Sequence, residues 1–253
     1  MNDLMQLYNQ HERIQLNLPD FQKIESPEIV KFVSSQGGGS FISYYNFPKV
    51  KAETLIAEEV RFFKRLAQPF EWKVYSNEPP VGLAGELLHF GFRAGTAETL
   101  MVCDLSNYSI EPKNDNPHVV NIRDSQGIRL MFSLLSQVWH VNFEHQQAQL
   151  IQAKRTHPED VQIYVAYAAH VPAACGWIVF NRESAFASLW GGTTLPQYRG
   201  RGLYRAILRQ RLHDAAIRGI RYVAIEASAM SRPIVEDFGF KPLSFVTPYF
   251  FYA

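Results

Sequence analysis

Cysteine is scarce in this chain. Only Cys103 and Cys175 occur among its 253 residues, both in apolar, strand-like runs and without CxxC spacing. A disulfide framework needs more cysteines at closer spacing. The pattern therefore predicts two reduced, buried thiols and a cytoplasmic protein.

An excess of either charge is missing as well. The chain has 25 basic and 24 acidic residues and a net charge of +1. Nucleic-acid-binding proteins concentrate Lys and Arg on one face, whereas here the basic residues are scattered, apart from one cluster between 199 and 211. We expect no nucleic-acid partner.

Long apolar runs are also absent. The first 13 residues are polar and lack the apolar core of a signal peptide. The most apolar long segment, 161–180, is interrupted by His170 and Pro172, so it predicts two buried strands and not a membrane span. We expect a soluble protein with no membrane partner.

Apolar residues make up 47% of the chain and aromatic residues 13%, enough for a full core in one large or two small domains. The clearest change of composition lies at 106–118, which is rich in Asn, Ser and Pro. We place a linker at 111–118, between a first domain at 1–110 and a second at 119–253.

Periodicity predicts an α/β protein. In the first half we expect an N-terminal helix, a Gly-rich turn at 37–39, strands at 41–47, 71–75 and 96–105, and helices at 52–66 and 81–89. In the second half we expect strands at 119–122, 161–168, 173–180, 185–194, 222–226 and 243–252, and helices at 128–138, 144–154, 202–218 and 232–238.

The two halves share a weak internal echo. A helix, strand, turn and helix precede His-Phe-Gly-Phe at 89–92, and the same order precedes Asp-Phe-Gly-Phe at 237–240. The echo indicates a tandem, pseudo-duplicated fold, with a coincidence of two turns as the alternative.

The most informative segment is 193–212. A strand ends near Thr194, Gly200 and Gly202 follow, and an apolar helical stripe then begins at Leu203. A strand, glycine loop and helix N-terminus bind phosphate, because free backbone N–H groups and the positive end of the helix dipole meet there. Arg199 and Arg201 add charge suited to a pyrophosphate.

Two other interpretations of this loop stay open. The glycines could serve a tight turn only. A nucleotide-binding interaction module would carry a Walker lysine or a ribose-binding acid, but Leu203 follows Gly202 and no GK[ST] occurs.

Residues 196–203, Pro-Gln-Tyr-Arg-Gly-Arg-Gly-Leu, resemble the coenzyme A signature of the GNAT superfamily of N-acetyltransferases, Arg/Gln-x-x-Gly-x-Gly/Ala. We place the register at Arg199-x-x-Gly202-x-Tyr204. The register Gln197-x-x-Gly200-x-Gly202 also fits literally, but it shifts the helical stripe by two residues. The resemblance runs from Val119 onward and includes Ser228–Phe240.

The resemblance implies a GNAT acyl-CoA N-acyltransferase fold, an α/β fold with a mixed sheet, and it implies the use of acetyl-CoA. Its fourth strand would offer main-chain groups to the pantetheine arm, and Ser228 stands at the family's usual Asn position, although an N-cap role suits Ser228 or Ser231 equally well. The implied coenzyme-binding residues are Gly192, Thr193, Thr194, Leu195, Arg199, Gly200, Arg201, Gly202, Leu203, Tyr204 and Ser228.

The chain differs from the family at the position of the general acid. Val235 stands where the family often has a tyrosine that protonates the leaving thiolate, and Val cannot donate a proton. In the chosen register Tyr204 replaces a small residue, so Tyr204 is our candidate acid.

Direct transfer also needs a base for the amine. Glu226 is the first candidate, followed by His140 and Glu144, with a strand-end salt bridge and a helix-end role as alternatives for Glu226 and His140. The carboxylates show no metal-site spacing, so we expect no metal.

The first half lacks the chemistry of the second. At the place of the glycine loop it has Phe47-Pro48-Lys49-Val50-Lys51-Ala52, so we expect a degenerate GNAT-like module that binds no second coenzyme A.

The predicted function is transfer of an acetyl group to a primary amine on a small molecule or peptide. A non-catalytic acyl-CoA sensor is the alternative. The fold does not determine the acceptor, and we expect a monomer or homodimer.

Overall fold

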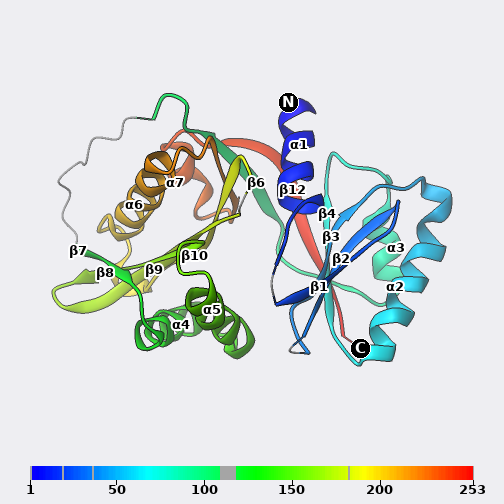
Figure 1. Cartoon of the computed structure of the whole chain (residues 1–253), viewed down its shortest axis with the longest axis horizontal. Helices are drawn as coiled ribbons and strands as arrows, with labels where there is room; N and C mark the ends of the chain where they lie inside the picture. The colour runs from blue at the N-terminus through cyan, green and yellow to red at the C-terminus, as the bar shows by residue number, and fades with distance from the viewer. Residues whose placement is uncertain (1, 19, 36, 109–117, 182, 253) are drawn as a thin grey trace. The chain divides into compact units, whose positions relative to one another are not determined.

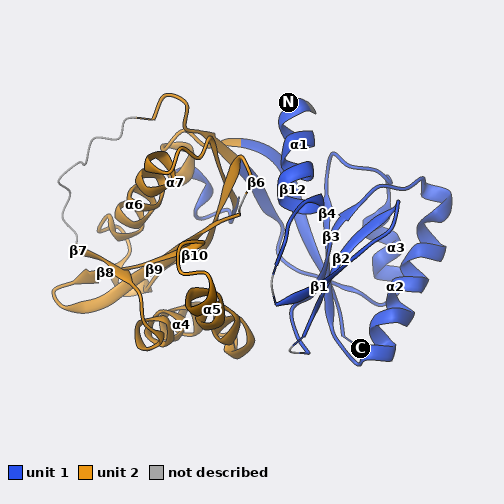
Figure 2. Cartoon of the chain, in the orientation of Figure 1, with its two compact units in different colours: residues 1–101, 226–233, 242–253 blue, residues 102–225, 234–241 orange. Residues whose placement is uncertain are grey.

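The computed structural model describes every residue except 1, 19, 36, 109–117, 182 and 253. Two compact units form, shown in different colours in Figure 2. Unit 1 comprises Met1–Met101, Glu226–Pro233 and Pro242–Ala253, and unit 2 comprises Val102–Ile225 and Ile234–Lys241.

Unit 1 contains a mixed sheet with strand order β1-β2-β3-β4-β12. Neighbours are antiparallel except for the parallel pair β3 and β4, and a short β5 pairs with β12. The strands are β1 (Phe21–Glu25), β2 (Ile29–Ser34), β3 (Ser40–Tyr45), β4 (Phe70–Tyr75), β5 (Arg93–Ala94) and β12 (Lys241–Phe251).

The helices of unit 1 are α1 (Asn2–Tyr8), the π-helical turn η1 (Asn9–Ile14), the 3₁₀ turn η2 (Lys49–Lys51), α2 (Ala52–Leu66) and α3 (Leu83–His89). Helix α2 buries Ile56, Val60 and Phe63, whose spacing of three and four residues forms one apolar face. This face packs with α3 on the sheet side that carries Phe70 and Trp72.

Unit 2 has the strand order β11-β10-β9-β8-β7, with β6 next to β11. The pairs from β7 to β10 are antiparallel and β10 is parallel to β11. The strands are β6 (Glu98–Asp104), β7 (His118–Ile122), β8 (Val161–Ala168), β9 (Val171–Phe180), β10 (Phe186–Thr194) and β11 (Tyr222–Ala227). Strands β6, β11 and β12 each contribute residues to both units.

Helices cover both faces of the sheet in unit 2 (Figure 1). Helices α4 (Ser125–Trp139) and α5 (Glu144–Thr156) cover one face, and α6 (Leu203–Ile217) and α7 (Arg232–Glu236) lie on the other. Asp124 caps α4, since its carboxylate accepts a hydrogen bond from the Gly127 N–H.

The structure confirms the mixed α/β fold and its internal repeat. A parallel strand pair with a helical crossover occurs once in each unit, as β3-α2-β4 and β10-α6-β11. The glycines of the two echoed turns, Gly91 and Gly239, both have φ +90°, a conformation that glycine adopts without strain.

Two expectations differ from the structure. Strands β1 and β2 were missing from the predicted elements, because 21–34 lacks a clean alternation of apolar and polar residues. The C-terminal strand β12, expected in the second domain, belongs to unit 1, where it pairs with β4 from Val246 to Phe251. Residues 111–117 of the expected linker lie outside the described residues.

No helix in the described part of the chain is both long enough and apolar enough to cross a membrane. Cys103 and Cys175 are buried free thiols, as predicted.

Candidate functional site

A glycine loop joins β10 to α6 in unit 2. After β10 ends at Thr194, a 3₁₀ turn (η3, Pro196–Tyr198) leads into Gly200 and Gly202, whose φ values are +74° and +77°. A Cβ built on either glycine would have no atom within 4 Å. The main chain is therefore open on its outer side where the helix begins, as an anion site requires.

The start of α6 bears on the coenzyme signature. Helix α6 begins at Leu203 with Gly202 as its N-cap, and both Gly200 and Gly202 have a left-handed backbone conformation that favours glycine. In either register of the signature Gly202 is a glycine position, and Tyr204 lies in the first turn of the helix. The register at Arg199-x-x-Gly202-x-Tyr204 stays a prediction, and so does Tyr204 as the acid.

Two exposed cations flank the loop. The Arg199 Nε donates to the Thr194 carbonyl at 3.3 Å, and the Arg201 guanidinium lies 5.3 Å from the centre of the Tyr198 ring. Neither forms a salt bridge with another described residue. Both are placed to meet an anionic ligand.

A cavity of about 680 Å³ adjoins the loop. The loop contributes Arg201 and Leu203, and strands β7 and β8 and the turn after β8 contribute the other lining residues, which are His118, Val120, Tyr167, Ala168, Ala169 and His170. Its volume suits a small organic ligand.

Strands β10 and β11 separate beside the loop. Their parallel ladder runs from Phe186 with Tyr222 to Leu189 with Ile225, and β10 continues to Thr194 beyond the last described pair. A diverging pair of strands leaves one edge of β10 accessible to an extended ligand.

A bulge reshapes β10 at this point. Trp190 pairs with Trp177 and Thr193 with Cys175, so Gly191 and Gly192 together face a single residue of β9. A Cβ on Gly191 would lie 1.9 Å from the Trp177 ring. The bulge therefore requires glycine at this position.

Tyr204 lies directly against the bulge. A Cβ on Gly192 would lie 2.6 Å from the Tyr204 ring and 3.2 Å from its hydroxyl oxygen. The phenol thus faces the Gly192–Leu195 segment, which the family resemblance associates with the pantetheine arm and thioester.

Arg211 is a residue that sequence reasoning missed. Its side chain is completely buried, and its Nη1 donates to the Trp177 and Trp190 carbonyls at 3.3 Å each. Its Nε and Nη2 have no hydrogen-bond partner among the described residues. Burial lowers the Arg211 pKa, and the neighbouring Tyr204 raises it only in part.

The helical period could have revealed this position. Arg211 follows Ile207 by four residues and Leu208 by three, which places it on the buried face of α6. A cation on an apolar face is the available signal. The composition of 199–211 gave only a basic cluster.

The end of β10 is otherwise well packed. The Trp139 Nε1 donates to the Thr193 hydroxyl at 2.8 Å, Leu195 is buried, and the Thr194 hydroxyl is buried without a partner among the described residues. His140 is the left-handed C-cap of α4, with φ +54°. This agrees with its helix-end alternative.

Glu226 and Ser228 belong to unit 1. The Lys73 Nζ lies 2.5 Å from the Glu226 Oε2 in a salt bridge, the arrangement given as the alternative to a catalytic role. The Ser228 hydroxyl accepts from the Ser231 N–H at 3.2 Å, so it caps the turn that precedes α7.

Other carboxyl groups cluster near this ion pair in unit 1. Burial raises the pKa of Glu98 to about 7, Glu226 raises it further and Lys73 opposes the shift. Burial also raises the pKa of Glu71. A carboxyl that titrates near neutrality is suited to proton transfer, and nothing in the sequence marks Glu98.

Val235 is completely buried in α7, so this position supplies only packing. No group of three His, Cys, Asp or Glu side chains in the described residues is arranged to hold a metal ion.

Several solved structures with similar folds are named as acetyltransferases. A GCN5-related N-acetyltransferase from Kribbella flavida has a TM-score of 0.70 at 12% identity, covering 97% of this chain and 93% of its own. A tandem GNAT protein from the clavulanic acid biosynthesis pathway has a TM-score of 0.60 at 13% identity, covering 94% and 85%. A GCN5-related N-acetyltransferase from Sphaerobacter thermophilus has a TM-score of 0.60 at 13% identity, covering 99% and 84%.

The sequence matches no protein-family model and no curated protein. The structural likeness, at these identities, establishes the fold: this chain has the GNAT fold along nearly its whole length, and a tandem protein is among the similar structures.

Proposed function

We propose that this protein transfers an acetyl group from acetyl-CoA to a primary amine of a small molecule or peptide. The observation that carries the proposal is the open glycine loop at the N-terminus of α6, next to the point where β10 leaves the β11 ladder. The similar acetyltransferase folds support it.

The chain's own groups provide the binding chemistry. The N–H groups around Gly200 and Gly202, with Arg199 and Arg201, suit the pyrophosphate of coenzyme A. The edge of β10 near its bulge suits the amide-bearing pantetheine arm, since an extended polar chain can hydrogen-bond to an open strand edge. Ser228 remains a proposed contact of the coenzyme, although its hydroxyl already caps a turn.

The reaction is a direct transfer. The amine nitrogen attacks the thioester carbonyl carbon, a C–N bond forms and the C–S bond breaks. The departing thiolate takes a proton from the Tyr204 hydroxyl, and the amine loses its proton to a base, for which Glu226 is our proposal. Arg211, buried beside Tyr204, would stabilise the phenolate that forms.

The loop assignment is tested by Gly202→Val. A β-branched residue at φ +77° is strained, and its side chain would occupy the open space above the loop. We expect acetyl-CoA binding to be lost in calorimetry. Gly219→Val, at φ +71° with no atom within 4 Å, is the matched control at the other end of α6, and its affinity should be unchanged. Equal affinity in the two variants would contradict the assignment.

Unit 1 should bind no coenzyme. Its equivalent segment passes through Pro48 and a 3₁₀ turn directly into α2, without a left-handed residue. The same titration should therefore give one acetyl-CoA per chain, and a stoichiometry of two would refute this.

A non-catalytic acyl-CoA sensor is the second candidate, favoured by the buried Val235 at the family's acid position. Release of free coenzyme A, followed with a thiol reagent over a panel of amines, distinguishes the two. Tight binding without release for any amine would favour the sensor. A cytoplasmic location stays a prediction.

A further inference from the structure

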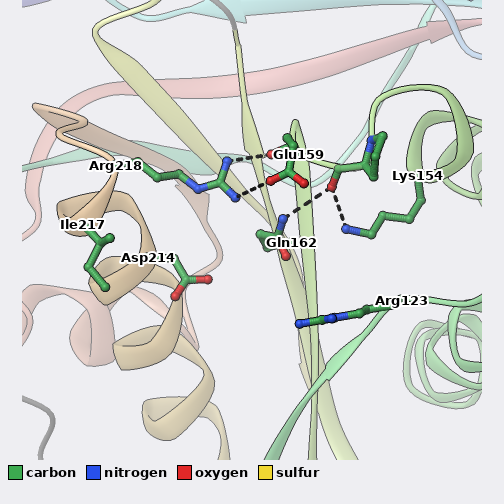
Figure 3. A pocket seen from close by; sticks show the side chains of 8 residues that line it. Arg123, Lys154, Glu159, Gln162, Asp214, Ile217 and Arg218 are labelled. Atoms are coloured by element: carbon green, nitrogen blue, oxygen red, sulfur yellow. Dashed lines mark hydrogen bonds and ion pairs between the residues drawn. The ribbon is translucent and has the colours of Figure 1, made fainter.

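Unit 2 contains a second cavity, of about 450 Å³, at the C-terminal end of α6 (Figure 3). Its walls come from the ends of β7, α5 and α6, the start of β8 and the turn before it. The lining residues are Arg123, Lys154, Pro158, Glu159, Gln162, Asp214, Ile217 and Arg218. Because α6 spans about 20 Å at 1.5 Å per residue, this cavity is separate from the glycine loop at the other end of the helix.

Lys154 is held by main-chain oxygens. Its Nζ donates to the Pro158 and Val161 carbonyls, both at 2.7 Å. Carbonyls fix the ammonium group but leave its charge uncompensated. Burial lowers the Lys154 pKa; Glu159 opposes this shift, while Arg123 and Arg218 lower the pKa further.

Arg218 is fixed in a similar way. Its Nη1 donates to the Glu159 carbonyl at 2.6 Å, and its guanidinium lies 4.0 Å from the centre of the Phe180 ring. The Glu159 carboxylate is 3.8 Å from Arg218 and its side chain is 82% exposed, so water screens most of this attraction.

Arg123 is the least constrained of the three cations. It follows β7, and Figure 3 shows its side chain extending toward the cavity. It forms no hydrogen bond or salt bridge within the described part of the chain. Lys154 and Arg218 lie at helix C-termini, where a cation favours the helix dipole, but this explanation does not apply to Arg123.

The opposite wall carries one carboxyl, Asp214. It accepts hydrogen bonds from the Tyr164 hydroxyl and from the Gln210 Nε2, so neutral groups hold it. Burial raises its pKa to about 6, against an opposing effect of Arg218. The three cations thus outnumber Asp214 and the exposed Glu159.

We propose that this basic pocket, formed by Arg123, Lys154, Gln162 and Arg218, binds a small metabolite through an oxyanion group, either a phosphate or a carboxylate. A concave site whose cations outnumber its carboxylates favours an anion. The cavity volume exceeds that of a bare ion and suits a small organic molecule.

Calorimetry with inorganic phosphate and, separately, with citrate tests the proposal in a buffer free of other multivalent anions. We expect saturable binding of at least one of them: binding of phosphate alone indicates a phosphate ligand, and binding of citrate alone a carboxylate ligand. Arg123→Gln should weaken the binding about tenfold or more, the scale of one lost charge-assisted hydrogen bond.

One further variant serves as a control, and another should change the anion affinity in the opposite direction. Arg129, exposed on α4 and bonded to the Ser125 hydroxyl at 3.2 Å, lies outside the pocket, so Arg129→Gln should leave the affinity unchanged. Asp214→Asn removes a negative charge from the wall and should tighten binding about threefold. Gly202→Val should keep anion binding, which separates this site from the proposed coenzyme loop.

Two results would overturn the proposal. One is the absence of saturable binding of both anions to the wild type. The other is an equal loss of affinity in Arg123→Gln and Arg129→Gln, which would show that only the net charge matters.

Discussion

In each unit, the strand that precedes the crossover helix has an irregularity in its pairing. A buried arginine donates hydrogen bonds to main-chain carbonyls at this irregularity. In unit 1 the β2–β3 register shifts at Ser43, and the Arg13 Nε donates to the Ser43 carbonyl at 2.6 Å. In unit 2 the bulge of β10 is met by Arg211. In both units, an arginine N–H group therefore donates to main-chain carbonyls at a place where the regular strand pairing is interrupted.

The two arginines differ in their partners. Arg13 Nη1 lies 2.7 Å from both carboxylate oxygens of Glu78, and its guanidinium lies 4.1 Å from the centre of the Tyr75 ring. Burial lowers the Arg13 pKa, but Tyr75 and Glu78 outweigh it and raise the pKa overall. Arg211 has no carboxylate partner among the described residues, and its pKa is lowered.

This difference in partners suggests a structural role for Arg13 and a functional role for Arg211. A buried ion pair with hydrogen bonds on both partners holds a fold together and is costly to break. A buried cation without a counter-ion instead leaves a positive potential at the bulge, next to Tyr204. Such a residue destabilises the fold unless a ligand or reaction uses the charge.

The largest expected effect concerns Tyr204. If the potential of Arg211 supports proton donation, Tyr204→Phe should lower kcat about 10²- to 10⁴-fold, the scale of general acid catalysis, with little change in coenzyme affinity. The measurement is a pH–rate profile with a responsive amine. Tyr198→Phe is the control, since that ring lies in the same loop beneath Arg201.

A Tyr204→Phe enzyme with wild-type turnover and an unchanged basic limb would show that the ring only packs against Gly192. Arg211 would then have no catalytic group to support, and the contrast with Arg13 would be lost.

The next largest effect is on stability, when either arginine is replaced by methionine. Arg13→Met leaves Glu78 buried without its cation, and we expect a loss of about 3–5 kcal/mol in the free energy of unfolding. Arg211→Met leaves no buried charge behind, so the relief of burying an unpaired cation offsets its lost hydrogen bonds, and the free energy of unfolding should change by less than about 1 kcal/mol. Urea denaturation of both variants provides the measurement.

Activity should show the reverse order. Arg211→Met should lower kcat at least about tenfold, with partial recovery in Arg211→Lys, because a cation remains near Tyr204. Equal stability losses in the two Met variants, or full turnover in Arg211→Met, would remove the distinction between the two arginines.

Local sequence was sufficient for the parts of the site that local chemistry forms. The loop at 195–202 could be predicted because Pro196, Gly200 and Gly202 act on their own backbone. The bulge and Arg211 depend on which residues of β9 and β10 face each other, and composition does not report that register. The similarity of the two Phe-Gly-Phe turns could likewise be predicted, because it depends on neighbouring residues in the sequence.

Long-range pairing explains the remaining differences. Strand β12 reads correctly as a strand, but its partner β4 is more than 160 residues earlier in the chain, and no local pattern specifies that choice.

The smallest expected effect is a pH dependence that arises in unit 1. Glu98 has its pKa raised from 4.5 to about 7, chiefly by burial, so the folded state holds this proton more tightly than the unfolded state does. Stability should therefore fall as the pH rises from about 4.5 to 7, with the full penalty above pH 7. Because the side chain is only partly buried, we expect on the order of 1 kcal/mol.

Glu98→Gln removes this penalty and should be more stable than the wild type above pH 7 and equal to it below pH 4.5. Glu86→Gln, at another position of unit 1 on α3, provides the control and should follow the wild type across the range. The measurement is the urea midpoint as a function of pH. If Glu98→Gln keeps the wild-type slope, the pH dependence of stability belongs to another group and not to Glu98.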